Sequence, residues 1–177
     1  MRIFCYLVSI VIANVVTARF APLEMGMFIV PIGTFFVGAT FIFRDLVQNK
    51  YGRKKTYFFI FIALFLSAAV SFSLGDTLMI VAASALSFII SETADTEIYT
   101  RLKLPMAWRV LYSSIVGGLL DSTVFVIVGL SPLGAGFLPW AAVPAAIVGQ
   151  VIVKTALQLV GVWVIVQGQA LREKRLA

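Results

Sequence analysis

The sequence has 177 residues, of which 61% are hydrophobic and only 12% are charged, and its formal net charge is +6. Soluble domains carry about 25% charged residues, so this composition indicates an integral membrane protein built from helices. One cysteine and no histidine exclude an internal disulfide and argue against a zinc, iron or haem site and against Ser-His or Cys-His catalysis. We therefore expect no metal and no cofactor.

Six segments are apolar over about the length of ~20 residues that a spanning helix needs. Short stretches rich in glycine, proline, serine and aspartate separate them, as expected for tight connections. The sequence predicts one all-α domain over residues 1–177 with six transmembrane helices. The segments are 3–18, 27–43, 57–74, 78–91 with an extension past Asp95, 110–130 and 143–166.

Lysine and arginine favour cytoplasmic loops, and an even number of spans places both termini on the side of the second and fourth loops. That side holds twelve of the fourteen basic residues, the opposite side holds only Arg19, and Lys154 lies within a span. We expect a multi-pass protein of the cell inner membrane with cytoplasmic termini, whose basic residues serve topology and lipid contact, not nucleic acid. A cleavable signal peptide over 1–18, which would leave five spans, is the alternative.

The end of the fourth span is acidic, and ionisable residues inside a membrane usually line a pathway or a ligand site. Glu92 and Asp95 are three residues apart, so their carboxylates share a helix face. Arg44 and Asp45 lie at the inner end of the second span, where we expect them to pair with these acids across helices or to close a gate.

Two further ion pairs follow from spacing and depth. Glu97 precedes Arg101 by four residues, which favours a local pair at the membrane surface. Asp121 and Lys154 lie near the middle of consecutive spans, which predicts a buried pair. Such a pair adds little stability over apolar packing, and Lys154 belongs to a stripe with Gln150 and Gln158, so we expect a polar cavity there.

Four blocks of the sequence resemble, in the same order, the bacterial vitamin uptake transporter family, whose assigned substrates are queuosine precursors such as 7-cyano-7-deazaguanine. The resemblance implies a six-helix membrane protein that imports a deazaguanine for tRNA modification and is not an enzyme. The blocks are 43–48 with 51–53; 92–99; Arg109 with Ser113, Ser114, Asp121 and Ser122; and Gly149 and Gln150 with Lys154.

The family is also similar in helix count to substrate-binding subunits of energy-coupling-factor transporters. Those subunits carry an Ala-x-x-x-Ala docking pattern on the first helix, whereas Ala13 and Ala18 are five residues apart here, which argues against docking on an ATPase module. A subunit of an ATP-driven transporter, an intramembrane enzyme with paired aspartates and an assembly subunit remain the alternatives. Three glycines in the spans, Gly117, Gly118 and Gly161, fit packing within one chain or in a homo-oligomer.

A deazaguanine suits the polar residues of the spans. One carboxylate can accept both its N1–H and its amino group, while lysine and amide groups can donate to its O6 and cyano group. We hypothesise that Glu92 or Asp121 holds the guanine edge, and energy coupling stays open between a proton, facilitated diffusion and ATP. The predicted substrate-binding residues are Asn14, Glu92, Asp95, Asp121, Gln150 and Lys154, and the predicted gating or structural ion pairs involve Arg44, Asp45, Glu97 and Arg101.

Overall fold

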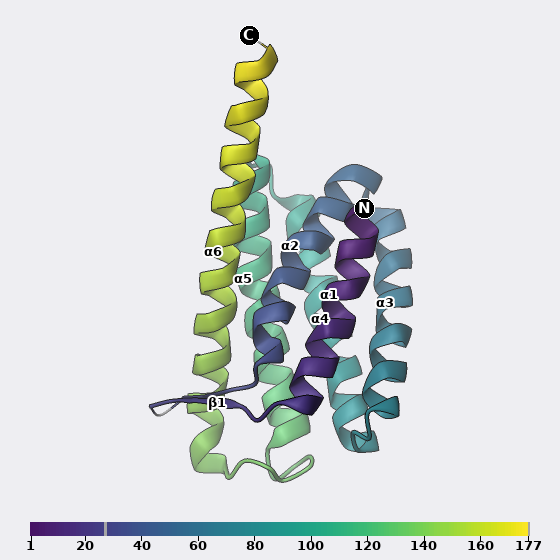
Figure 1. Cartoon of the computed structure of the whole chain (residues 1–177), viewed down its shortest axis with the longest axis vertical. Coiled ribbons are helices and arrows are strands. Elements are labelled where there is room, and N and C mark those ends of the chain that lie inside the picture. Colours follow the sequence, from purple (N-terminus) through teal and green to yellow (C-terminus); the bar gives the residue numbers. More distant parts are fainter. Residues whose placement is uncertain (27, 177) are drawn as a thin grey trace.

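The computed structural model describes residues 1–26 and 28–176, and side chains up to residue 168. Within this part of the chain, six long helices run up and down through one bundle, and both termini lie at the same end of it (Figure 1). We refer to the opposite end as the loop end. The helices are α1 (Arg2–Arg19), α2 (Gly33–Tyr51), α3 (Arg53–Ser73), α4 (Leu78–Arg101), α5 (Met106–Val124) and α6 (Val143–Leu176).

A short β-hairpin at the loop end was not predicted. Strand β1 (Leu23–Met25) pairs antiparallel with β2 (Phe28–Val30), and Gly26 has a φ of 64°, which suits a tight turn. The second helix therefore begins at Gly33 and not at residue 27, which itself lies outside the described residues. The expected all-helical architecture holds apart from this strand pair, in which only β2 is built from β-branched and aromatic residues.

The connection between α2 and α3 is a single residue, Gly52, whose φ of 79° only glycine adopts readily. The basic stretch around it was expected to be a loop, but its residues continue the two helices instead. The turn between α3 and α4 falls where the sequence predicts it. There Gly75 has a φ of 91°, and Thr77 caps α4 by accepting a hydrogen bond from the backbone N–H of Ile80.

Helix α5 continues into six residues of π-helix, η1 (Phe125–Leu130), which end the predicted fifth span at the expected residue. A loop and a 3₁₀ turn, η2 (Trp140–Ala142), lead into α6. Helix α6 has 34 residues, which corresponds to about 51 Å at 1.5 Å per residue. Its C-terminal part extends beyond the rest of the bundle (Figure 1).

The helices form a closed ring in the order α1, α2, α6, α5, α4 and α3, with α3 returning to α1. Helix α2 leans into the middle of this ring and contacts each of the other five long helices. Helix α2 is therefore surrounded by protein along much of its length. This position explains how α2 can carry Arg44 and Asp45, whose side chains are fully buried.

Five helical segments of the described chain are long and apolar enough to span a membrane: Arg2–Arg19, Arg53–Ser73, Leu78–Arg101, Met106–Leu130 and Trp140–Gly168. Helix α2 is long enough but more polar, because it contains Arg44, Asp45 and Lys50. The surface agrees with a lipid environment. Large apolar side chains such as Phe58, Phe61 and Phe65 of α3 are more than half exposed, whereas many polar side chains are buried.

Candidate functional site

A cavity of about 570 Å³ lies inside the ring of helices and reaches the loop end. Its volume falls within the range of roughly 300–1,000 Å³ that is usual for small-molecule sites. Serines of α3 and α4 line one side of it, and four phenylalanines contribute flat apolar surface. The serines are Ser67, Ser71, Ser84, Ser87 and Ser91, and the aromatic residues are Phe41, Phe88, Phe125 and Phe137.

Lys154 of α6 is the main cation of the cavity wall. Its ammonium group donates to the Asp121 carboxylate at 2.7 Å and to the Ser122 hydroxyl at 2.8 Å, while the side-chain oxygen Oε1 of Gln150 lies 3.5 Å away. The side chain of Lys154 is 2% exposed and that of Asp121 is 15% exposed. The predicted ion pair between these two residues is thus confirmed, with Asp121 the more accessible partner.

Gln150 is one helical turn before Lys154 and also lines the cavity. The residue is only 3% exposed, and its amide nitrogen has no hydrogen-bond partner in the described part of the chain. A buried donor without an acceptor costs about 1–3 kcal/mol. A bound molecule with an acceptor at this place would remove that cost, so the Gln150 amide is a natural ligand contact.

The third member of the stripe, Gln158, has a structural role instead. Its side chain is fully buried and donates from the amide nitrogen to the Ser114 carbonyl oxygen at 2.8 Å, which ties α6 to α5. Gly118 makes this approach feasible, since a Cβ added there would lie 3.2 Å from the Gln158 amide nitrogen. Gly118 therefore packs within the chain.

Asn14 of α1 lines the cavity and also joins two helices. Its amide nitrogen donates to the Ser67 hydroxyl of α3 at 2.8 Å. This contact is the helix-to-helix hydrogen bond that polar residues commonly form in membrane bundles. Asn14 is consequently placed to contact a ligand, but part of its hydrogen-bonding capacity is already used.

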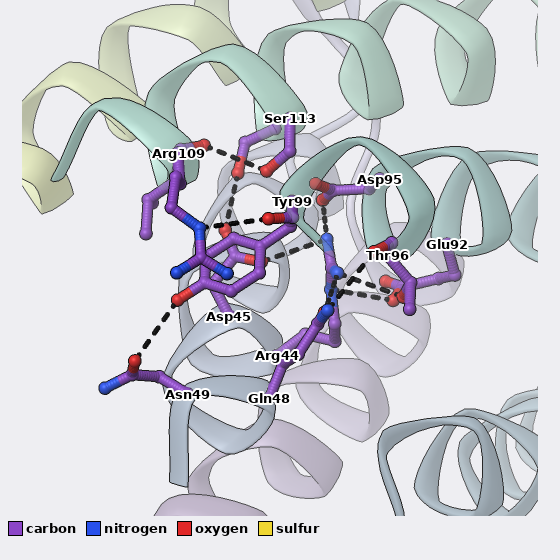
Figure 2. A network of polar contacts seen from close by, with 12 residues as sticks. Arg44, Asp45, Gln48, Asn49, Glu92, Asp95, Thr96, Tyr99, Arg109 and Ser113 are labelled. Atoms are coloured by element: carbon purple, nitrogen blue, oxygen red, sulfur yellow. Dashed lines mark hydrogen bonds and ion pairs between the residues drawn. The ribbon is translucent and has the colours of Figure 1, made fainter. Parts of the chain in front are cut away.

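At the inner end of the cavity, Arg44 lies among three carboxylates, a group that we call the Arg44 cluster: Arg44, Asp45, Glu92 and Asp95. Its guanidinium group contacts Asp45 at 3.2 Å and Glu92 at 3.3 Å and is also paired with Asp95 (Figure 2). All four side chains are at most 2% exposed. Arg44 was expected to pair with Glu92 or Asp95 across helices, and it contacts both.

Neighbouring polar side chains support the Arg44 cluster. Arg44 donates to the Gln48 side-chain oxygen at 2.9 Å and to the Thr96 hydroxyl at 3.0 Å. The Asp45 carboxylate accepts a hydrogen bond of 3.2 Å from the Ser114 hydroxyl of α5. Helices α2, α4 and α5 are thereby joined by one polar network (Figure 2).

A smaller hollow of about 240 Å³ lies on the other side of the Arg44 cluster, next to the end that carries the termini. Its wall includes Gln48, Tyr99 and Arg109. The Arg109 guanidinium lies 4.0 Å from the centre of the Tyr99 ring and donates from Nε to the Tyr99 carbonyl oxygen at 3.0 Å (Figure 2). The Arg44 cluster therefore lies between the large cavity and the smaller hollow.

Glu97 belongs to the rim, as its spacing from Arg101 predicts. Its carboxylate lies 3.5 Å from the Arg101 guanidinium and 2.5 Å from that of Arg53, whose side chains are 80% and 51% exposed. The hydroxyl of Tyr57 also donates to it at 2.6 Å. An exposed network of this kind contributes little to stability.

Five of the six residues predicted to bind substrate line the same cavity: Asn14, Glu92, Asp121, Gln150 and Lys154. Asp95 is not part of its wall and lies within the Arg44 cluster. Sequence reasoning missed Tyr6, which is fully buried on α1 with its hydroxyl facing the Glu92 carboxylate. It also missed Gln48, although its position one turn after Arg44 is a usable signal.

The two aspartates that an intramembrane protease would need are committed to different partners. Asp95 pairs with Arg44, whereas Asp121 pairs with Lys154 and borders the cavity. A catalytic pair of aspartates requires the two carboxylates to share one site. The geometry instead suits the binding of a small polar molecule within the bundle.

Comparison with known proteins agrees with this geometry. The model of the family described as "Putative vitamin uptake transporter" matches residues 68–167, more than half of the chain. The chain belongs to this family. No curated protein and no solved structure matches it. The region matched by the family model contains four residues of the cavity wall, Glu92, Asp121, Gln150 and Lys154.

Proposed function

We propose that this vitamin uptake transporter imports a queuosine precursor, 7-cyano-7-deazaguanine or a related deazapurine, across the bacterial inner membrane for tRNA modification. The observation that carries the proposal is the grouping of carboxylates, an unpartnered amide and a lysine around one cavity inside a membrane bundle. The sequence blocks that resemble the queuosine-precursor transporters supply the same residues.

The cavity offers complementary groups to a deazaguanine. Lys154 contacts Oδ2 of Asp121, so Oδ1 of Asp121 and the Glu92 carboxylate are the acceptors available to N1–H and the amino group. The Gln150 amide and the Lys154 ammonium group supply donors for O6 or the cyano group. The phenylalanines of the wall provide surfaces on which a flat ring can stack.

The two hollows give the proposed route of the substrate. The large cavity reaches the loop end, where residues such as Pro22, Asp76 and Phe137 line it. With both termini cytoplasmic and α2 as the sixth span, as the distribution of basic residues favours, this conformation is open to the outside. The Arg44 cluster then forms the inner gate, which must separate before the substrate reaches the smaller hollow.

Binding to purified protein tests the proposal. A ligand at 100 times its Kd stabilises the native state by about 2.7 kcal/mol, or roughly 5–11 °C in unfolding midpoint for a chain of this size. We expect such a shift with 7-cyano-7-deazaguanine and none with 7-deazaadenine, which lacks the N1–H and amino donor pair. Labelled precursor should also accumulate in cells only when the protein is present.

Substitution of the two acids identifies the residue that holds the guanine edge. Loss of a hydrogen bond to a charged group costs about 1.5–3 kcal/mol, so Asp121→Asn or Glu92→Gln should weaken binding roughly 10- to 150-fold. Glu97→Gln is the matched control, because Glu97 lies on the same helix as Glu92 but at the rim. Wild-type affinity in both acid variants would contradict the proposed binding mode.

A further inference from the structure

The charges of the buried gate do not balance. Three carboxylates, those of Asp45, Glu92 and Asp95, surround one guanidinium group, that of Arg44. Arg109 is a second cation within electrostatic reach of Asp45. Two cations and three buried carboxylates leave one negative charge without compensation. A desolvated, uncompensated carboxylate is so unfavourable that it binds a proton instead.

The surroundings single out Glu92 as the acid that takes this proton. Asp45 has support from Arg44, from the Ser114 hydroxyl and from Arg109. Asp95 is paired with the Arg44 guanidinium and is not part of the cavity wall. Among the described residues, the one ion-pair contact of Glu92 is that of 3.3 Å with Nε of Arg44.

Charged groups on the other helices also surround Glu92. Asp45 of α2 shares the Arg44 guanidinium with Glu92, and Asp121 of α5 lines the same cavity. Lys154 of α6 pairs with Asp121, so its positive charge compensates the charge of Asp121 and not that of Glu92. Tyr6 of α1 is fully buried near Glu92, and its neutral hydroxyl supplies no charge that could compensate a carboxylate.

Glu92 is also the member of the Arg44 cluster that lines the large cavity. Water and protons that enter from the loop end therefore reach it directly, and so does the substrate. In contrast, Asp95 is fully buried behind it. Glu92 thus belongs both to the substrate cavity and to the gate, and this arrangement couples events in the cavity to opening of the gate.

We propose that Glu92 is the proton-binding residue that couples uptake to the proton gradient. The proton binds from the cavity, neutralises the excess charge of the gate, and leaves on the side of the smaller hollow when the gate opens. Asp121 is then the carboxylate that stays ionised for the guanine edge. The coupling step rests on the proposed transport function, whereas the bound proton does not.

Infrared spectroscopy tests the bound proton without any substrate. A protonated carboxyl group has a C=O stretching band that is separate from the bands of carboxylates. For protein in lipid at neutral pH, we expect one such band in the wild type, its loss in Glu92→Gln, and its retention in Glu97→Gln. Absence of the band from folded wild-type protein, or its persistence in Glu92→Gln, would overturn the assignment even if transport is observed.

Transport into liposomes tests the coupling. With the interior more alkaline by one pH unit and the membrane potential clamped, one proton per neutral substrate drives about tenfold accumulation. A sodium gradient of the same size should drive none. Exchange of labelled for unlabelled 7-cyano-7-deazaguanine without accumulation in the pH gradient would refute coupling but leave the substrate assignment intact. Absence of any exchange would refute the substrate, and the infrared band would still decide whether Glu92 holds a proton.

Discussion

Substitution of Arg44 by glutamine should be among the most destabilising single changes in this protein. The substitution removes the guanidinium group that lies among three carboxylates, each of them at most 2% exposed. Loss of one partner from a buried ion pair costs about 3–5 kcal/mol, because the remaining charge stays buried without compensation. For a chain of this size, 1 kcal/mol corresponds to about 2–4 °C in unfolding midpoint, so we expect a decrease of roughly 6–20 °C.

Thermal unfolding of purified protein in detergent measures this effect. Arg53→Gln is the matched control, because Arg53 also pairs with a glutamate but is 51% exposed, and an exposed pair contributes about 0.2–1 kcal/mol. Adding Asp95→Asn to Arg44→Gln should restore part of the lost stability, since it removes one of the uncompensated charges. An unfolding midpoint for Arg44→Gln within the range of the Arg53→Gln control would refute the described cluster.

Two further substitutions test the cavity wall and the helix packing. Gln150→Ala removes the unpartnered amide and should raise the Kd for 7-cyano-7-deazaguanine about 2- to 13-fold, the equivalent of one neutral hydrogen bond. The control Gln167→Ala, at an exposed position of the same helix, should leave the Kd unchanged. Equal effects of the two substitutions on the Kd would contradict the contact between Gln150 and the ligand. Gly117→Ala should destabilise the fold by about 1–3 kcal/mol, because an added Cβ would lie 3.0 Å from the Phe41 ring and 3.1 Å from Asp95 Cβ. The control is Gly168→Ala, where an added Cβ meets nothing within 4 Å. Comparable unfolding midpoints for the two variants would show that α4 and α5 do not pack this closely.

Much of the architecture follows from the sequence because a membrane imposes simple rules on it. Long apolar runs predict helices, and the positions of glycine and proline predict their ends, as at Gly75 and Leu130. Periodicity also placed Glu92 and Asp95 on one face, and matched depth predicted the pair of Asp121 with Lys154. These relations are local or concern neighbouring helices, so spacing alone is enough to predict them.

The hairpin and the central position of α2 were not predictable in the same way. The apolar run before Gly33 fits a helix and a strand equally well, and the pairing of β1 with β2 depends on their mutual contact. Sequence reasoning placed Asp95 in the substrate site because it shares a face with Glu92. The same reasoning expected Arg44 to pair with the acids of α4, but it could not show that Asp95 lies within the Arg44 cluster and outside the cavity wall.

The role of Tyr6 also depends on tertiary packing. Tyr6 is one of five tyrosines in an aromatic-rich chain, and its place near Glu92 depends on how the ring of helices brings residues of α1 and α4 to the same cavity. The same holds for the choice of phenylalanines that line the cavity, since fifteen are present in the sequence. Composition predicts that aromatic surface is available, whereas only the three-dimensional arrangement assigns it.

The length of α6 has a practical consequence for work on this protein. About 51 Å of helix exceeds a hydrocarbon layer of about 30 Å by roughly 20 Å, and the excess lies at the end of the bundle that holds both termini (Figure 1). A fluorescent reporter fused to the C-terminus would therefore stand clear of the lipid surface. A reporter that matures only in the cytoplasm would then reveal the orientation of the chain in living cells through its brightness, without any need to purify the protein.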